Sequence, residues 1–474
     1  MLKMYKESSD SPQKPPLPKA KAENAGKIQF DLGGNKIHFV SLGCPRNLVD
    51  SEVMLGILLK AGYESTPEQQ EADFVIINTC GFLEASRKES TDTIAQALAT
   101  RKKGAKVIAT GCMVQKHSEE LQKKIPNIDY LLGSGDLEGI LKAVESTQQG
   151  QTITTARSYL EAGDIPRQVS TPRHYAYLKI AEGCRKRCAY CIIPAIKGPL
   201  KSKSKEQILK EFNKLLEMGT HEIVLIAQDL GDYGKDQGSK RQAALIDLIK
   251  SMLAVKKDFW LRLLYLYPDE INDELIALMK SDKRICRYLD MPIQHINDQM
   301  LKSMHRATSK ADIISTIEKL RAEMPDVVIR TSLIVGFPGE TEEQFKELMA
   351  FIQKYPLDNI GIFKFSREPG STAYDYPDQI SEEIKEDRYH RLMQTQQKVL
   401  AKLNKKWLGK KIPVMIEGYH PETKLLMRGR SHGQCPEIDG QILINDGRKV
   451  KGFGQVYTVE ITDIADYDLV GRAV

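Results

Sequence analysis

The sequence predicts an α/β protein with an N-terminal open parallel α/β domain, a partial (βα)6 barrel and a small C-terminal antiparallel β-barrel. At 474 residues the chain is too long for one hydrophobic core, so two or three domains are expected. Short apolar runs alternate with helical patterns over residues 36–150 and again over 173–380, which is typical of parallel sheets. From residue 411 onward, helical periodicity gives way to short alternating runs, which indicate a small β-barrel.

Changes in composition set the expected domain boundaries. Residues 1–27 hold six lysines against three acidic residues, so half of the net charge of +6 lies in a segment typical of disorder. The overall charge therefore does not indicate a nucleic-acid partner. The expected segments are a disordered tail (1–35), the α/β domain (36–150), a linker (151–172), the partial barrel (173–380), a connecting helix (381–408) and the small β-barrel (409–474).

The composition also indicates where the protein works. Hydrophobic residues make up 41% and charged residues 28% of the chain, as in soluble globular proteins. No apolar stretch approaches the roughly 18–20 residues of a membrane helix, and the N-terminus lacks the apolar core of a secretory signal. We therefore expect a cytoplasmic protein with no membrane partner. In a reducing compartment, clustered cysteines bind metals or do chemistry more often than they form disulfides.

Three thiols follow predicted strands of the first segment. The predicted strands are 37–43, 73–79, 106–111 and 130–135. Cys44, Cys80 and Cys112 each stand just past the end of one of them, and in an open parallel sheet these ends form one edge. We therefore expect the three thiols to converge and to bind metal. Zinc with a water ligand is an alternative, and an iron–sulfur cluster is favoured. Three unrelated buried cysteines are the structural alternative.

A second group of thiols lies in GCRKRCAYC, residues 183–191, where Cys184, Cys188 and Cys191 are spaced C-x3-C-x2-C. Zinc ribbons pair their thiols in two separated halves, which this stretch does not do. Bacterial ferredoxins use four cysteines in a different spacing. Three thiolates on a four-iron cluster leave one iron without a protein ligand, and an open metal position is a reactive one.

Six βα units follow over residues 173–380. The strand candidates begin with YAYLKIAEG and continue with EIVLIAQD, WLRLLYLYP, YLDMPIQH, VVIRTSLIVGFPGE and NIGIFKFS. Six units are fewer than the eight of a closed barrel. The three-thiol loop follows the first strand, and βα loops are where such barrels place their chemistry.

The C-x3-C-x-aromatic-C spacing after the first strand of a βα barrel resembles the radical S-adenosylmethionine (SAM) enzymes. The resemblance implies that SAM binds at the open iron and is cleaved to a 5′-deoxyadenosyl radical, with Tyr190 near the adenine. Other positions that it assigns to SAM are Gln228 and Asp229 (methionyl part), Gln294 and His295 (ribose and methionine), and Val335 and Gly336 (adenine). Ordinary strand-end polar residues and a turn glycine are the alternative for these positions.

A three-Cys α/β domain, a radical SAM barrel and a TRAM-like β-barrel together resemble the methylthiotransferases over residues 36–474. The resemblance implies two [4Fe-4S] clusters, the second held by Cys44, Cys80 and Cys112 and carrying a sulfur atom. One SAM would methylate this sulfur, and a second would supply the radical. An unactivated C–H bond is beyond acid–base catalysis, whereas a cofactor radical can open it while the protein positions the reactants.

Two branches of this family differ in substrate. One modifies isopentenylated adenosine beside the tRNA anticodon, and the other modifies the β-carbon of an aspartate in small-subunit ribosomal protein twelve. SLGCPRNLVDSE (41–52), LIAQDLGDYG (225–234), LDMPIQH (289–295) and the terminal YDLVGRAV resemble the second branch. The resemblance implies an electron donor such as flavodoxin or ferredoxin, and we expect a monomer. A non-catalytic, metal-stabilised scaffold that binds ribosomal components is the alternative from another class.

Charge patterns bear on the substrate. Residues 412–474 hold seven basic and nine acidic residues, whereas a module that grips RNA should present a basic face. Residues 183–205 hold seven basic residues and no acid. This charge indicates either a solvated loop or a site entrance that attracts the carboxylate of SAM or an acidic substrate. KGPLKSK (197–203) departs from the arginine-rich stretch of the family, and lysine does not reproduce the bidentate fork of arginine.

Overall fold

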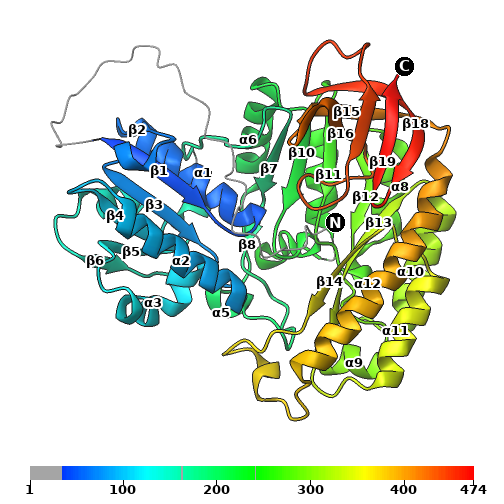
Figure 1. Ribbon diagram of the computed structural model, residues 1–474, viewed down its shortest axis with the longest axis horizontal. Coiled ribbons are helices and arrows are strands. Elements are labelled where there is room, and N and C mark those ends of the chain that lie inside the picture. Colours follow the sequence, from blue (N-terminus) through cyan, green and yellow to red (C-terminus); the bar gives the residue numbers. More distant parts are fainter. Residues whose placement is uncertain (1–34, 162–163, 241) are drawn as a thin grey trace.

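The structure is a computed structural model that describes residues 35–161, 164–240 and 242–474 (Figure 1). Apart from Asn35, the tail predicted over 1–35 lies outside the described residues. The described chain forms two six-stranded sheets, a two-stranded sheet and a closed five-stranded barrel, which confirms the predicted fold class. None of the helices in these ranges is long and apolar enough to cross a membrane.

The N-terminal sheet is parallel throughout and has the order β2-β1-β3-β4-β5-β6. Its apolar strands are buried on both faces, by α1 and α4 on one side and by α2 and α3 on the other. The four predicted strands are confirmed, whereas β2 and β6 are too short for periodicity to reveal. The bounds are β1 Lys36–Ser41, β2 Glu64–Ser65, β3 Phe74–Thr79, β4 Lys106–Gly111, β5 Tyr130–Gly133, β6 Gly150–Thr152, α1 Pro45–Lys60, α2 Glu84–Thr100, α3 Cys112–Lys124 and α4 Ile140–Glu145.

The second sheet is also parallel, and its order β14-β13-β12-β11-β10-β7 follows the chain without closing. Helices cover its outer face, where the largest apolar core lies. The six predicted strands are confirmed. The bounds are β7 Tyr175–Lys179, β10 Glu222–Ile226, β11 Trp260–Leu263, β12 Ile285–Asp290, β13 Val328–Val335, β14 Asn359–Lys364, α6 Lys205–Glu217, α7 Ala243–Leu253, α8 Asp273–Ser281, α9 Asp298–Ser303, α10 Lys310–Glu323 and α11 Glu342–Lys354.

A small insertion between β7 and α6 carries the thiol loop. The chain forms β8 (Ala181–Glu182), the loop, α5 (Ile193–Lys197) and β9 (Lys201–Ser202), and β8 pairs with β9 in antiparallel fashion. The loop is therefore closed at its base by a two-stranded ladder. A Cβ on Gly183 (φ +79°) would lie 2.2 Å from the carbonyl oxygen of Pro199, so this turn requires glycine.

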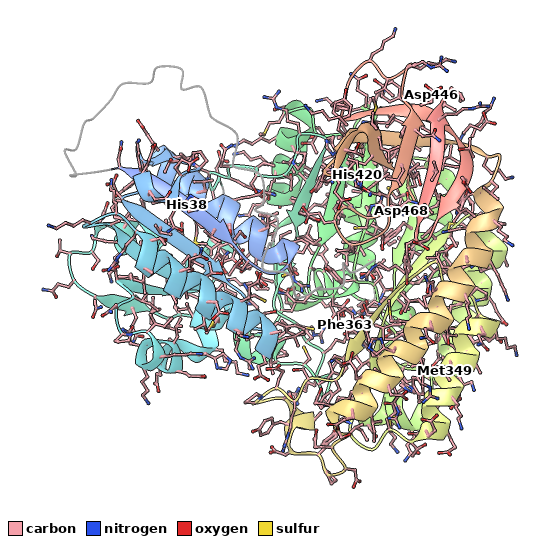
Figure 2. All side chains as sticks on the ribbon, viewed as in Figure 1. His38, Met349, Phe363, His420, Asp446 and Asp468 are labelled. Atoms are coloured by element: carbon pink, nitrogen blue, oxygen red, sulfur yellow. The ribbon has the colours of Figure 1, made fainter. Side chains whose placement is uncertain are left out.

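The C-terminal barrel differs from the prediction in one strand pair. Four of its five pairs are antiparallel, but β17 and β19 run parallel. A closed ring with an odd number of strands cannot alternate direction at every step, so one parallel pair is unavoidable. Asp468, labelled in Figure 2, accepts a hydrogen bond from Gln441 N at 2.8 Å at the entry to this pair. The bounds are β15 Lys411–His420, β16 Thr423–Arg430, β17 Ile442–Asp446, β18 Gln455–Ala465 and β19 Asp468–Ala473.

A long helix and a loop attach the C-terminal barrel to the second sheet. The helix predicted over 381–408 is α12 (Glu382–Asn404), which lies beside α11 (Figure 1). The loop between β16 and β17 packs on the inner face of the open sheet, because Arg262 donates to His432 O at 2.7 Å and Tyr288 to Asp439 Oδ2 at 2.7 Å. The inner face of the partial barrel is thus filled in part by the appended domain.

Four buried charges join the N-terminal domain to the second sheet. Asp50 on α1 is paired with Lys179 at the end of β7 and with Lys197 on α5, whose Nζ lies 3.1 Å from Asp50 Oδ2. Lys179 Nζ also lies 2.7 Å from Glu182 Oε2. Each of the four side chains is at most 5% exposed, and two positive charges balance two negative ones. Such an arrangement fixes how the two domains meet, because a buried charge without its partner is costly.

Lys179→Met tests this interface. It leaves Asp50 and Glu182 with one lysine between them, so we expect the free energy of unfolding to fall by about 3–5 kcal/mol. Urea unfolding followed by circular dichroism measures the change. Lys36→Met is the matched control, because the Lys36–Glu71 pair is largely exposed and should contribute about 0–1 kcal/mol. Equal unfolding midpoints for the two variants would contradict the assigned role of the interface.

Candidate active site

Cys44, Cys80 and Cys112, here called the N-terminal triad, lie at the carboxyl edge of the first sheet. Cys80 and Cys112 directly follow β3 and β4 as predicted, whereas Cys44 follows the end of β1 by three residues and caps α1. Gly43 (φ +87°) allows the first two loops to meet, because a Cβ there would lie 3.0 Å from Cys80 Sγ. A Cβ on Gly81 would likewise lie 2.7 Å from the backbone of Met113, beside Cys112.

Two cations face the N-terminal triad. Burial alone would raise the pKa of Cys44, but the charges of Arg46 and Lys197 hold it below its usual value. Burial raises the pKa of Cys112 to about 12, although Lys197 acts in the opposite direction. The two positive charges thus favour the thiolate form, which is the form that binds metal, at Cys44, whereas burial keeps the pKa of Cys80 and Cys112 above its usual value.

Cys184, Cys188 and Cys191, here called the barrel triad, lie in the loop after β7 and β8. Burial raises the pKa of Cys184 to about 12 and that of Cys191 to about 11. The Tyr267 hydroxyl lies 3.6 Å from Cys188 Sγ, and Arg306 Nη1 lies 3.7 Å from the same sulfur. Sequence reasoning missed both residues, because nothing in their local sequence sets them apart.

The spacing of the thiols bears on which metal they suit. A tetrahedral zinc ion with Zn–S bonds of about 2.3 Å would bring its thiols to about 3.8 Å from one another. Among the described residues, the group whose ligand atoms all lie within 4.8 Å of one another is Asp229, Asp232 and Glu270. In neither triad, therefore, do all three sulfurs lie within 4.8 Å of one another, so a single tetrahedral zinc ion would require the thiols to move closer together. An all-thiolate donor set is also the one that iron–sulfur clusters use.

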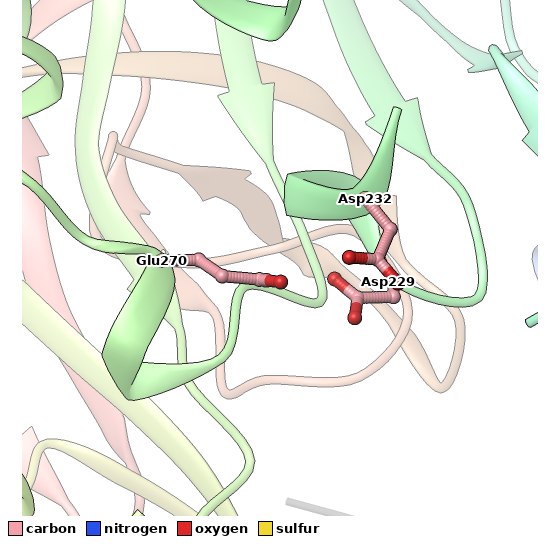
Figure 3. A group of neighbouring side chains, drawn as sticks. All are labelled: Asp229, Asp232 and Glu270. Carbon is pink, nitrogen blue, oxygen red and sulfur yellow. The ribbon is translucent and has the colours of Figure 1, made fainter. Parts of the chain in front are cut away.

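The acidic group Asp229, Asp232 and Glu270 is buried beside the barrel triad (Figure 3). Lys186, from within the thiol loop, lies 3.1 Å from Glu270 Oε1 and 3.5 Å from Asp229 Oδ2. Lys235 lies 3.5 Å from Glu270 Oε1 and also pairs with Asp232. Burial and the neighbouring Glu270 carboxylate raise the pKa of Asp229 well above its usual value. The group therefore ties the thiol loop to the ends of β10 and β11 through lysines.

The predicted SAM residues Gln228, Gln294 and His295 lie at strand ends. Gln228 donates to Glu182, a member of the buried charge network. Gln294 (φ +71°) forms an isolated bridge with Leu333, in a conformation that is uncommon for glutamine. His295 is fully buried, and its Nε2 lies 3.3 Å from Glu340 Oε1. These contacts leave the assignment of the three residues to SAM as a prediction.

Glu340 organises the end of β13. Besides His295, it accepts hydrogen bonds from Gly336 N and from Arg388 Nη1 at 2.9 Å. A Cβ on Gly336 (φ +71°) would lie 2.3 Å from Lys385 Cγ, so helix α12 requires glycine at this position. Glu340 is the last residue of IVGFPGE (334–340), a motif interpreted through Val335 and Gly336 and not through its glutamate. The proposed contact between adenine and Val335 or Gly336 stays a prediction.

An apolar cluster lies beside the barrel triad. Half-buried Tyr190 packs with Phe337, Phe365 and Met304. Burial raises the pKa of the Tyr190 hydroxyl well above its usual value, so the ring stays neutral. The structure thus places Tyr190 in an apolar cluster beside the thiols, and its contact with adenine stays a prediction.

Fold and site together define a radical SAM enzyme with a second thiol triad. The chain matches the radical SAM superfamily over residues 178–352, the TRAM domain over 408–474 and "Uncharacterized protein family UPF0004" over 36–133. Radical SAM membership implies a [4Fe-4S] cluster and SAM.

Relatives named ribosomal protein uS12 methylthiotransferase RimO include those of Protochlamydia amoebophila (74% identical, covering 94% of both chains) and Geotalea uraniireducens (46%, covering 93% of this chain and 98% of the relative). The chain belongs to the RimO family.

Among solved structures, the radical SAM methyltransferase TsrM from Kitasatospora setae has a similar fold. The TM-score is 0.52 at 14% identity, and the match covers 72% of this chain and 77% of that chain. At this identity the likeness supports the fold alone.

Iron content tests the assignment of two triads. Replacing Cys44, Cys80 and Cys112 together by alanine should halve the iron bound after anaerobic reconstitution, from about eight to about four per chain. The corresponding change of the barrel triad should give the same loss. Cys286→Ala is the control, because Cys286 is buried among apolar residues and should leave the iron content unchanged. A variant of the N-terminal triad with full iron content would contradict the second site.

Proposed function

We propose that this chain transfers a methylthio group to the β-carbon of an aspartate in the small-subunit ribosomal protein uS12. The proposal is supported by RimO relatives that match over more than nine-tenths of their length. The observation that carries it is the presence of two separate thiol triads, one on each side of a single domain interface. A radical enzyme that only abstracts hydrogen needs one triad, and the second gives the transferred sulfur a place.

We propose that the barrel triad holds a [4Fe-4S] cluster with SAM and that the N-terminal triad holds a second cluster. When bound, these groups supply a 5′-deoxyadenosyl radical, which removes hydrogen, and the sulfur that joins the carbon. The residues proposed to hold SAM are Tyr190, Gln228, Asp229, Gln294, His295, Val335 and Gly336.

This chain's own residues bind, orient and exclude water. Lys186 and the β8–β9 ladder hold the barrel triad against β10 and β11. Arg306 and Tyr267 lie against the sulfur of Cys188. The buried charges at the domain interface fix the distance between the two triads. Fixed geometry of this kind is what the protein contributes when a cofactor carries the reactive group.

We also propose that residues 36–150, 173–380 and 409–474 act as three domains of a cytoplasmic monomer. A low-potential electron donor such as flavodoxin or ferredoxin would supply the electrons for SAM cleavage. The inner-face loop between β16 and β17 supports a fixed placement of the C-terminal domain on the second sheet.

A direct assay tests the substrate. The reconstituted protein, reductant and SAM are incubated separately with purified uS12 and with isopentenylated tRNA, and each product is analysed by mass spectrometry. We expect uS12 to gain one methylthio group at an aspartate and the tRNA to stay unchanged. The barrel-triad alanine variant is the control and should give no product. Methylthiolation of the tRNA alone would overturn the substrate, and no SAM cleavage at all would favour a scaffold.

A further inference from the structure

Arg46 lies between the two triads. It follows Cys44 by two residues, and its Nη1 donates across the domain interface to Ala227 O at 2.8 Å. Its guanidinium lies 4.9 Å from the centre of the Tyr265 ring, at the end of β11. Its charge acts on Cys44 of the N-terminal triad and on Cys191 of the barrel triad, which places the guanidinium near both. One half-buried side chain of the N-terminal domain therefore contacts residues of the second sheet at the ends of β10 and β11.

Arg46 differs from the lysines around the two triads in having no carboxylate partner within the described residues. Lys179 and Lys197 pair with Asp50, and Lys186 pairs with Glu270. Arg330, further inside the barrel, pairs with Asp290. A guanidinium has five N–H donors in a planar fork, and the carbonyl of Ala227 accepts from Nη1 alone. The sulfur of Cys44 also accepts a hydrogen bond from this guanidinium, and the N–H donors that reach neither acceptor are available to an incoming group.

We propose that Arg46 binds the side-chain carboxylate of the target aspartate and so selects and positions the substrate. The inference rests on the proposed function, because it takes its ligand from that substrate. A guanidinium and a carboxylate match in shape and charge and form two parallel hydrogen bonds. The ring of Tyr265 packs against the guanidinium of Arg46 and limits the directions in which its N–H groups can point.

The chemistry of the target explains why this contact matters. In aspartate the carboxylate is bonded directly to the β-carbon, so holding the carboxylate places the reacting carbon one bond away. The contact lies between the barrel triad, on the side of hydrogen removal, and the N-terminal triad, on the side of sulfur. Asparagine has the same shape but lacks the charge, so a site built around a guanidinium should reject it.

The experiment compares two ligands on the reconstituted full chain. The dissociation constants of fluorescently labelled uS12 with aspartate or with asparagine at the modified position are measured by anisotropy. The wild-type chain should bind the aspartate form about 10- to 100-fold more tightly. In Arg46→Gln this ratio should fall to about one, while Arg46→Lys, which keeps the charge but loses the fork, should retain part of it.

Controls separate recognition from a structural role. Because Arg46 also faces the thiol of Cys44, the affinity ratios are compared between samples of the wild-type chain and Arg46→Gln with equal measured iron content. Arg173→Gln, at an exposed arginine beyond the opposite, amino-terminal end of β7, should keep the wild-type ratio. Equal weakening of both ligands by Arg46→Gln would overturn the inference and leave the proposed function standing. Failure of the wild-type chain to bind or modify uS12 would overturn both.

Discussion

The relative placement of the two triads depends on the four buried charges of Asp50, Lys179, Glu182 and Lys197. One of them comes from the N-terminal domain and three from the second sheet and its insertion. Buried ion pairs add little net stability compared with apolar packing, but removing one partner is costly. The network therefore disfavours every arrangement of the two domains except the one in which all four charges are paired.

The same network reaches both sites. Lys197 lies close enough to the N-terminal triad to favour the thiolates of Cys44 and Cys112. Glu182 stands two residues before Cys184, and it also accepts from Gln228 at the end of β10. A change at the domain interface would thus alter the charge beside the thiols of the N-terminal triad and the position of the loop that carries the barrel triad. This coupling explains why the interface is polar where an apolar contact would be simpler to build.

Local sequence patterns predict the strands and the thiols well, because both follow short-range rules. Buried parallel strands give continuous apolar runs, and thiols at strand ends share one edge of the sheet. The buried charge network at the interface was not predictable in this way. Asp50 and Lys197 are 147 residues apart, and no periodic sequence pattern links residues so far apart. The need for glycine at position 336 likewise comes from Lys385 on a later helix. The parallel pair of β17 and β19 follows from closing five strands, which no single strand reveals.

The most direct test is the position of iron in a crystal of the anaerobically reconstituted chain, located from anomalous scattering at the iron edge. We expect two iron centres, one at each triad, with Arg46 between them. A single iron centre at the barrel triad would contradict the account. Two centres separated by packed protein would contradict it equally, because the sulfur could then not reach a carbon radical formed at the first site.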